Sequence, residues 1–382
     1  MIMKKNEFWS IVLLMAISLP MLTSCGGDDD GPSKKEEVYV PKDGESVRTY
    51  ENSGDDYEYM GHYTFINGGT ELKLIETGKY FSYIPQYVEY KSKKYPVTCI
   101  GRYACGSRMK DYENIGFYSI DIPESVNTIE EYAFAGCHAL MVSIPSSVKN
   151  IGENAFERCN DLYEIKISEG ISVINSETFW YCDNLTTFSI PKSVKEIKDY
   201  AFAYCSKLAS VSIPNSVTSI GKNAFYRSGL TSITIPNSVT IIEENAFYGC
   251  KITSLTIPGS IEKIDKSTFG NCELLKSVVI EDGVKEIGRS AFIGCIELGC
   301  IEIPETVLSI DDYAFNTNKS NKEFGILQRV ISKISNPFPI NKNSFSETFR
   351  EYGTLYVPIG TIDKYKTTEG WKEIKNIIEL DN

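Results

Sequence analysis

Hydrophobic and polar positions repeat along the middle of the chain in a unit of 22 or 23 residues that occurs nine times. A phenylalanine ends an Ala-Phe or Thr-Phe pair in each unit, and successive phenylalanines are 22, 23, 23, 23, 22, 22, 23 and 23 residues apart. They are Phe134, Phe156, Phe179, Phe202, Phe225, Phe247, Phe269, Phe292 and Phe315. A fixed period of this length predicts a solenoid of stacked coils.

The unit around Phe225 shows how one coil is built. Alternating apolar residues predict a short strand with every second side chain inward. Pro214 ends this strand, and Gly221 is expected to permit a tight bend. The inward residues are Leu208, Val211, Ile213, Val217, Ile220 and Phe225. Burying six side chains does not offset the entropy of ordering a whole coil, so each coil needs its neighbours.

The pattern Leu-x-x-Ile-x-Ile-Pro-x-Ser-Val-x-x-Ile-Gly-x-x-Ala-Phe-x-x-Cys resembles the BspA-like leucine-rich repeats of bacterial surface proteins. The match covers about residues 97–318 and includes a degenerate first copy that ends at Cys105. Local departures from the pattern are Ser168, Thr178, Ser228, Thr268 and Glu281. The resemblance implies a right-handed, curved solenoid, mainly β with short turns and 3-10 or helical pieces, whose strands lie on the concave face.

The N-terminal residues have the layout of a secretory signal peptide. Lys4 and Lys5 precede an apolar run that is too short to span a membrane. The segment Leu22-Thr23-Ser24-Cys25 resembles a bacterial lipoprotein box, which implies a signal peptide at 1–24 and a lipid on Cys25. The alternative is an ordinary signal peptide with an incidental cysteine. Residues 25–44 predict a flexible acidic and glycine-containing linker, whose Gly-Asp run resembles the export tag of some surface lipoproteins.

The two ends of a solenoid must be sealed, and the remaining segments are predicted to do so. Residues 45–96 predict an N-terminal β cap with a turn at Gly68-Gly69 and a hairpin from Tyr87 that leads into the first coil at residue 97. Residues 97–318 form the predicted solenoid. Residues 319–382 lose the period and predict a degenerate repeat and a C-terminal cap.

Composition and charge exclude several classes of function. The net charge of −12 disfavours nucleic acids and anionic membrane surfaces, so any membrane contact is expected through the lipid alone. The only histidines are His62 and His138, and no catalytic or phosphate-binding motif is present. An acidic pair could act on sugars, but none stands out from the repeats. We therefore expect no enzyme, no cofactor and no metal.

Seven of the 11 cysteines follow the repeated phenylalanine by three residues and therefore form one column. Its members are Cys137, Cys159, Cys182, Cys205, Cys250, Cys272 and Cys295, and Ser228 fills the vacant position. Small apolar cysteines suit a crowded interior, so we predict mostly buried thiols. Disulfides within the column stay open as an alternative. A straight ladder cannot surround a metal ion. Cys99, Cys105 and Cys300 lie outside this column.

Two surfaces are candidate binding sites. Outward residues of the strands define a flat, hydroxyl-rich concave face, comprising Glu164, Lys166, Thr187, Ser189, Ser210, Ser212, Ser232, Thr234, Ser254 and Thr256. The alternative is that serine and threonine simply suit an exposed sheet. An aromatic band on the other side comprises Trp180, Tyr181, Tyr204, Tyr226 and Tyr248. It could hold a partner or sugar rings, or it could be the outer layer of the core.

Two functions fit these features. The first, which the family resemblance supports, is a non-catalytic, adhesin-like lipoprotein that binds proteins of the host matrix or of neighbouring cells. The second is a surface lipoprotein that binds glycans and assists polysaccharide capture. In both, the lipid is expected to anchor the protein to the outer membrane, with the cell surface favoured over the periplasmic side.

Overall fold

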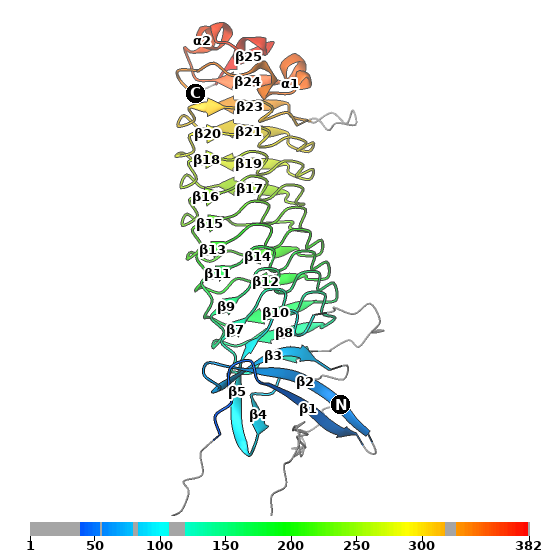
Figure 1. The fold of residues 1–382 in the computed structure, drawn as a ribbon. Coiled ribbons are helices and arrows are strands. Elements are labelled where there is room, and N and C mark those ends of the chain that lie inside the picture. The colour runs from blue at the N-terminus through cyan, green and yellow to red at the C-terminus, as the bar shows by residue number, and fades with distance from the viewer. Residues whose placement is uncertain (1–38, 54–55, 79–82, 107–118, 318–325, 381–382) are drawn as a thin grey trace, which may run out of the picture.

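The computed structural model describes residues 39–53, 56–78, 83–106, 119–317 and 326–380. They form a β-solenoid of about 12 turns, with repeats of ~23 residues and little helix, which confirms the predicted fold class. The coils form one tall stack between a β cap and a helical cap (Figure 1). The predicted signal peptide, Cys25 and most of the linker lie outside the described residues.

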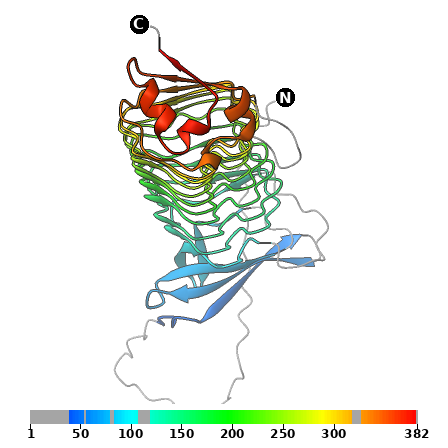
Figure 2. The ribbon, with the colours of Figure 1, turned by 90° about the horizontal axis from the view of Figure 1, so that it is seen from above.

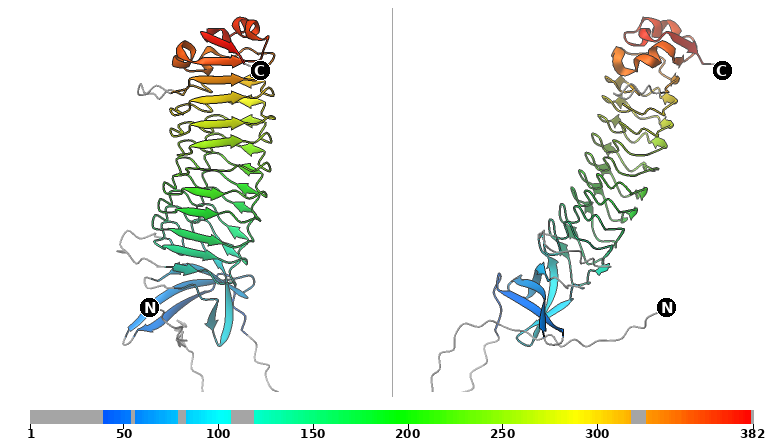
Figure 3. Two further views of the ribbon diagram at one scale, coloured as in Figure 1. Left: turned by 180° about the vertical axis from the view of Figure 1, so that it is seen from behind. Right: turned by 90° about the vertical axis from the view of Figure 1, so that its right-hand side faces the viewer.

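A first column of strands runs the length of the stack, and its members pair in parallel as β10-β8-β6, β12-β14 and β17-β19-β21-β23-β24-β25 (Figure 3). The register places equivalent positions of successive repeats side by side, for example Thr187 beside Ser210. The strands are β6 (Ser119–Asp121), β8 (Met141–Ile144), β10 (Glu164–Ile167), β12 (Thr187–Ser189), β14 (Ser210–Ser212), β17 (Ser254–Ile257), β19 (Ser277–Ile280), β21 (Cys300–Ile303), β23 (Arg329–Ser332), β24 (Thr354–Val357) and β25 (Asn376–Glu379).

A second column of two-residue strands lies beside the first (Figure 1). Each of these strands ends on a buried isoleucine. They are β7 (Thr128–Ile129), β9 (Asn150–Ile151), β11 (Val173–Ile174), β13 (Glu196–Ile197), β15 (Ser219–Ile220), β16 (Ile241–Ile242), β18 (Lys263–Ile264), β20 (Glu286–Ile287) and β22 (Ser309–Ile310). Each coil therefore pairs with its neighbours through two columns of strands.

The repeated phenylalanines form one continuous stack along the centre of the solenoid. From Phe134 to Phe315, neighbouring ring centroids are 4.9–5.7 Å apart and the ring planes differ by 4–15°. All these rings are buried. The stack continues to Phe345, whose ring centroid is 5.2 Å from that of Phe315. The predicted alignment is confirmed and extends one coil further than the sequence period indicated.

The tight turns of each coil lie on either side of this phenylalanine. Next to Phe225, Asn223 and Arg227 adopt left-handed backbone conformations with φ of 55° and 52°. Gly221 has no such conformation, but its carbonyl oxygen accepts the N–H of Ala224 at 3.3 Å, so the turn begins at this residue. A Cβ atom at Gly221 would lie 2.9 Å from the backbone nitrogen of Asp199. Glycine is therefore needed at this position because the preceding coil approaches closely.

The N-terminal cap is a small sheet whose last strand enters the first coil. Its strands are β1 (Ser46–Ser53), β2 (Asp56–Ile66), β3 (Glu71–Thr77), β4 (Tyr87–Tyr90) and β5 (Lys93–Ile100). Strands β1, β2 and β3 are antiparallel, β4 and β5 form a hairpin, and β5 pairs in parallel with β7. Gly68 and Gly69 supply the turn between β2 and β3 with φ of 71° and 75°. Both predicted turns of the cap are confirmed.

The C-terminal cap covers the open end of the stack. Figure 2 shows its helical segments lying across the last coils. They are η1 (Lys342–Ser344), α1 (Glu347–Tyr352), α2 (Ile362–Thr367) and η2 (Trp371–Glu373). Tyr365 and Trp371 are fully buried, with ring centroids 5.2 Å apart. Ile374, which follows η2, and Ile377 of β25 (Asn376–Glu379) are also buried, so this segment completes the core of the cap.

Replacing Phe225 by alanine should remove the central ring of three stacked coils. We expect Phe225→Ala to lower the free energy of unfolding by about 3–5 kcal/mol, because it leaves a cavity between Phe202 and Phe247. Thermal and urea denaturation measure this loss. Ser212→Ala, at an exposed strand position, is the control and should change stability little. Equal stability of the two variants would contradict a central role for the ring stack.

Candidate functional site

The outward side chains of the first strand column form one flat surface, which we call the strand face. Every residue predicted for the concave face projects here: Glu164 is half-buried, and Lys166, Thr187, Ser189, Ser210, Ser212, Ser232, Thr234, Ser254 and Thr256 are exposed. The parallel register aligns them in two rows along the stack. The sequence therefore identified both the position and the hydroxyl-rich character of this surface.

The strand face carries charged groups at both ends, and apolar and aromatic groups join them in its C-terminal part. Glu164 and Lys166 form an ion pair with an O–N distance of 3.2 Å. Beyond the central serines and threonines, Val279 is 54% exposed. Strands β23 to β25 add Arg329, whose guanidinium carbon lies 4.6 Å from the ring centroid of Tyr356. Sequence reasoning missed these last residues because they lie beyond the regular repeats.

The aromatic band is a ladder of rings that contact one another across successive coils. Tyr181 stacks on Tyr204 with a centroid distance of 4.3 Å, and Tyr226 stacks on Tyr248 at 5.1 Å. Tyr204 meets Tyr226 edge to face at 5.4 Å, and Trp180 meets Tyr181 in the same way at 4.7 Å. All five predicted residues are half-buried. The structure thus brings them together, as predicted.

The faces of these rings are already covered by other groups. The guanidinium of Arg158 lies over both Trp180 and Tyr181, 5.0 and 5.3 Å from their centroids. At the other end, Tyr248 packs so closely on Gly270 that a Cβ atom there would lie 2.9 Å from the ring. Sugars bind aromatic side chains through the ring face. The geometry therefore favours the alternative that this band is an outer layer of the core.

The cysteine column is a ladder of buried, protonated thiols. The ten cysteines within the described part of the chain are free, and the seven of the column are buried. The Cys205 thiol donates to the Phe179 carbonyl oxygen at 3.1 Å, and equivalent bonds recur along the column. Burial raises the pKa of Cys137, Cys250 and Cys295 to about 12. The predicted buried thiols are confirmed.

The three remaining cysteines have different positions. The N–H of Cys105 donates to the carbonyl oxygen of Ala133 in the next coil, just as the N–H of Phe134 donates to that of Ala155. Cys105 therefore occupies the phenylalanine position of the first coil. Cys99 is buried beside Glu130, with an S–O distance of 3.7 Å, and Cys300 is half-buried on the strand face. Among the residues that the structure describes, no group of three or more His, Cys, Asp or Glu side chains could hold a metal ion.

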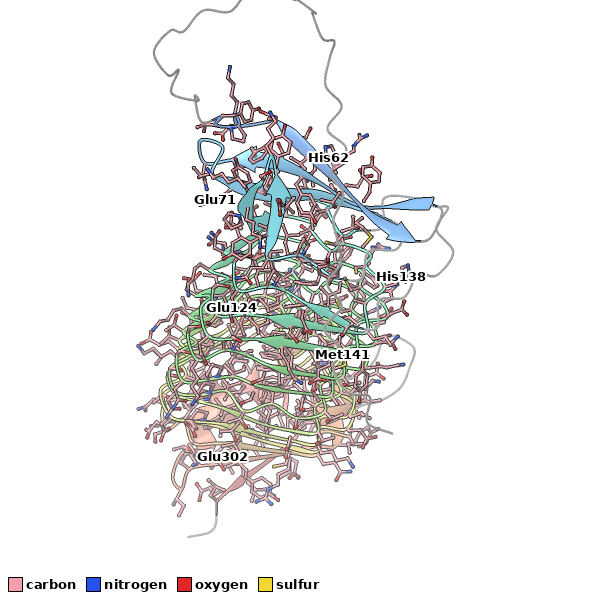
Figure 4. The ribbon with its side chains drawn as sticks, turned by 90° about the horizontal axis from the view of Figure 1, so that it is seen from below. His62, Glu71, Glu124, His138, Met141 and Glu302 are labelled. Carbon is pink, nitrogen blue, oxygen red and sulfur yellow. The ribbon has the colours of Figure 1, made fainter. Side chains whose placement is uncertain are left out.

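The two histidines do not meet. His62 lies on β2 of the cap and His138 lies on the flank of the solenoid (Figure 4). The Nδ1 atom of His138 is 2.7 Å from a carboxylate oxygen of Asp161. Burial lowers the pKa of His62, with a further contribution from Arg48. Within the described ranges, no helix is long and apolar enough to cross a membrane.

Comparison with known protein families matches the chain to the BspA type leucine rich repeat region over residues 108–209 and 195–322. These two overlapping ranges together cover more than half of the chain. No curated protein matches the chain significantly.

Several solved structures are similar in fold. A leucine-rich repeat protein from Bacteroides ovatus is 22% identical, with 84% of this chain and 98% of that chain covered and a TM-score of 0.50. A leucine rich cell surface protein from Faecalibacterium prausnitzii is 23% identical, with 87% and 95% covered and a TM-score of 0.46. The pneumococcal vaccine antigen PcpA is 17% identical, with 90% and 100% covered and a TM-score of 0.43. At these identities the similarity concerns the fold alone.

The raised thiol pKa values predict a loss of stability in alkali. An unfolded thiol ionises near pH 8.5, whereas Cys250 in the folded chain stays protonated to about pH 12. The stability that each buried thiol contributes is therefore fully present below pH 8.5, and it is lost as the pH rises toward the pKa of the folded state. At pH 10 each such thiol should cost about 2 kcal/mol. Between pH 8 and pH 10, we expect the free energy of unfolding of Cys250→Ala, measured by urea denaturation, to fall by about 2 kcal/mol less than that of the unmodified protein. An equal fall in both proteins would contradict a buried, protonated Cys250.

Proposed function

The chain belongs to the BspA-type leucine-rich repeat family, and from this premise we propose that it is a non-catalytic, adhesin-like binding protein of the cell surface. Proteins of this family are typically non-catalytic. The partners proposed are proteins of the host extracellular matrix or of neighbouring cells. The strand face is the proposed site of contact.

The observation that carries this proposal is the continuous exposure of the strand face. Its residues are held in register by the backbone ladders and point away from the core. A flat surface of many coils suits a protein partner better than a small molecule, since specific protein interfaces bury ~1,200–2,000 Å² in total. Small hydroxyls contribute little energy individually, whereas arginine and tyrosine are common at energetically important positions. Arg329 and Tyr356 meet that description.

The alternative proposal of a glycan-binding protein has less support from the aromatic band. The rings of Tyr181, Tyr204, Tyr226 and Tyr248 are stacked on one another or covered by neighbouring groups. Only their edges remain available. A glycan would therefore have to bind elsewhere on the solenoid.

The proposed location follows from the N-terminal residues. A lipid on Cys25 would anchor the chain to the outer membrane, and the polar linker would hold the solenoid away from it. The Gly-Asp run after this cysteine favours display on the cell surface.

Arginine substitutions on the strand face should weaken binding to a protein partner. We expect the triple variant Ser210→Arg, Ser212→Arg and Ser232→Arg to lose at least about tenfold in affinity, because long charged side chains prevent close approach. Surface plasmon resonance of the full-length protein in detergent against a panel of purified matrix proteins measures this change.

The matched control carries Ser172→Arg, Thr218→Arg and Thr240→Arg, which add the same charge at exposed positions outside the strand face. It should bind as the unmodified protein does. Equal losses in both variants would indicate a charge effect and contradict a contact on the strand face. Binding to glycans with none to matrix proteins would favour the alternative function.

Replacing Cys25 by alanine should release the protein from the membrane. We expect Cys25→Ala to appear in the soluble fraction, because the thiol that would carry the lipid is absent. Cell fractionation and immunoblotting measure this distribution. Cys300→Ser is a suitable control, since Cys300 lies in the solenoid and should not affect anchoring. Continued association of Cys25→Ala with membranes would contradict the lipid anchor.

A further inference from the structure

The surface of the solenoid is hollowed where the short strands end. A cavity of about 420 Å³ lies between β22 and the segment Phe338–Asn341 that follows β23. Leu308 and Ile310 belong to one wall, and Phe338, Pro339 and Ile340 to the other. Its volume falls within the ~300–1,000 Å³ range of small-molecule sites.

Pro339 helps to explain why this hollow exists. The carbonyl oxygen of Lys285 accepts the N–H groups of Leu308 and Ser309 from the next coil, at 2.8 and 3.3 Å. Phe345 pairs with Phe315, and six residues before each of them Pro339 stands where Ser309 stands in the earlier coil. Because proline has no N–H group, Pro339 cannot repeat the bond that Ser309 donates to Lys285. The next coil therefore does not close over β22 as the earlier coils close over one another.

The C-terminal cap holds the far wall of the hollow in place. The indole Nε1–H of Trp371 donates to the carbonyl oxygen of Phe338 at 2.9 Å. The N–H of Ile340 donates to the carbonyl oxygen of Glu369 at 3.1 Å. A Cβ atom at Gly370 would lie 2.1 Å from the carbonyl oxygen of Ile340, so the cap fits closely against this segment. The cavity is thus a fixed feature of the join between repeats and cap.

The polar groups around the cavity combine both donors and acceptors. Arg289 supplies a guanidinium, Asp311 and Asp312 supply two carboxylates, and Ser309 and Asn341 supply a hydroxyl and an amide. Arg289, Asp311 and Asn341 are exposed, and Ser309 and Asp312 are half-buried. Within the described residues, no ion pair joins Arg289 to either carboxylate. The guanidinium of Arg289 lies 5.8 Å from the ring centroid of Tyr313, and the Oδ1 atom of Asn341 accepts the N–H of Asn343 at 2.8 Å. The two carboxylates and the N–H groups of Arg289 are the polar groups that a ligand can use.

We propose that this cavity binds a sugar unit of a glycan. Asp311 and Asp312 outweigh Arg289 in charge and disfavour an anionic ligand, while the guanidinium of Arg289 needs a hydrogen-bond acceptor that a simple cation does not supply. A neutral sugar has hydroxyl groups that donate to the carboxylates and accept from the guanidinium. Its apolar C–H face can lie on Phe338, which is half-buried. All the groups around the cavity are then satisfied without burying an unpaired charge.

This inference rests on the proposed role as a binding protein and adds a ligand class at a second site. It does not depend on the strand face, since none of the cavity residues belongs to the first strand column. Contact with a glycoprotein could use both surfaces together. The strand-face variants should leave sugar binding unchanged, so the two proposals can fail independently.

Isothermal titration calorimetry of the full-length protein in a sugar-free detergent tests the proposal. The probes are glucose, galactose, mannose and N-acetylglucosamine, together with their linear trisaccharides. We expect saturable binding of at least one probe and a loss of at least about tenfold in affinity for Asp311→Asn combined with Arg289→Ala. The control Asp265→Asn changes the equivalent carboxylate two coils earlier, where no prolines interrupt the ladder.

A second variant fills the cavity without removing its charges. Ser309→Trp should abolish sugar binding, whereas Ser219→Trp at the equivalent position of β15 should not. Equal melting temperatures of these two variants would show that the fold is retained. Absence of binding to every probe, or binding that survives Ser309→Trp, would overturn the proposal. Binding of free amino acids in place of sugars would also overturn it, because it would indicate a site for paired opposite charges.

Discussion

The interaction on which the whole structure depends is the backbone pairing between successive coils in a fixed register. Phe202 donates its N–H to Ala224 of the next coil at 2.7 Å, and Tyr204 donates to Tyr226 at 2.8 Å. Left-handed residues at Tyr200 and Tyr204 turn these N–H groups toward the neighbouring coil. The spacing of paired strands is ~4.8 Å, which is close to the separation of stacked rings. Backbone pairing and ring stacking therefore require the same 22- or 23-residue period.

This constraint divides the side chains of each coil into two classes. Inward side chains contact equivalent residues above and below, so a change at one of them affects three coils. Outward side chains are not fixed by the register and are free to carry function. An outward position does not by itself make a side chain available for binding. In the aromatic band, Tyr204 is partly exposed, yet its ring faces are covered by Tyr181 and Tyr226. Among the described residues, the strand-face hydroxyl groups from Thr187 to Thr256 form no side-chain hydrogen bonds with one another, although Thr354 accepts one from Asn376. The strand face therefore remains the better candidate for recognition.

The sequence predicted those features that the period determines, and it failed where the period ends. The stack from Phe134 to Phe315, the buried cysteines and the hydroxyl-rich strand face all follow from equivalent positions in the repeat. Phe345 was missed because it lies 30 residues after Phe315, beyond the regular spacing. Arg158 and Arg227 were missed because their contacts with aromatic rings depend on left-handed turns at variable positions. The cavity depends on contacts with the cap that no local pattern encodes.

The join between the repeats and the cap explains why a small-molecule site would lie there. Within the array, each coil satisfies the backbone groups of the previous coil and leaves little room between them. At the join, Pro339 cannot donate, and Trp371 binds the carbonyl oxygen of Phe338. The side chains of Arg289 and Asp311, which would otherwise lie on a flat surface, then surround a hollow. The hollow lies at β22, nine coils after β5 in the second strand column, which at ~4.8 Å per coil is roughly 43 Å along the stack. The proposed anchor at Cys25 precedes the N-terminal cap, so the hollow would lie toward the end of the solenoid that is opposite the proposed lipid.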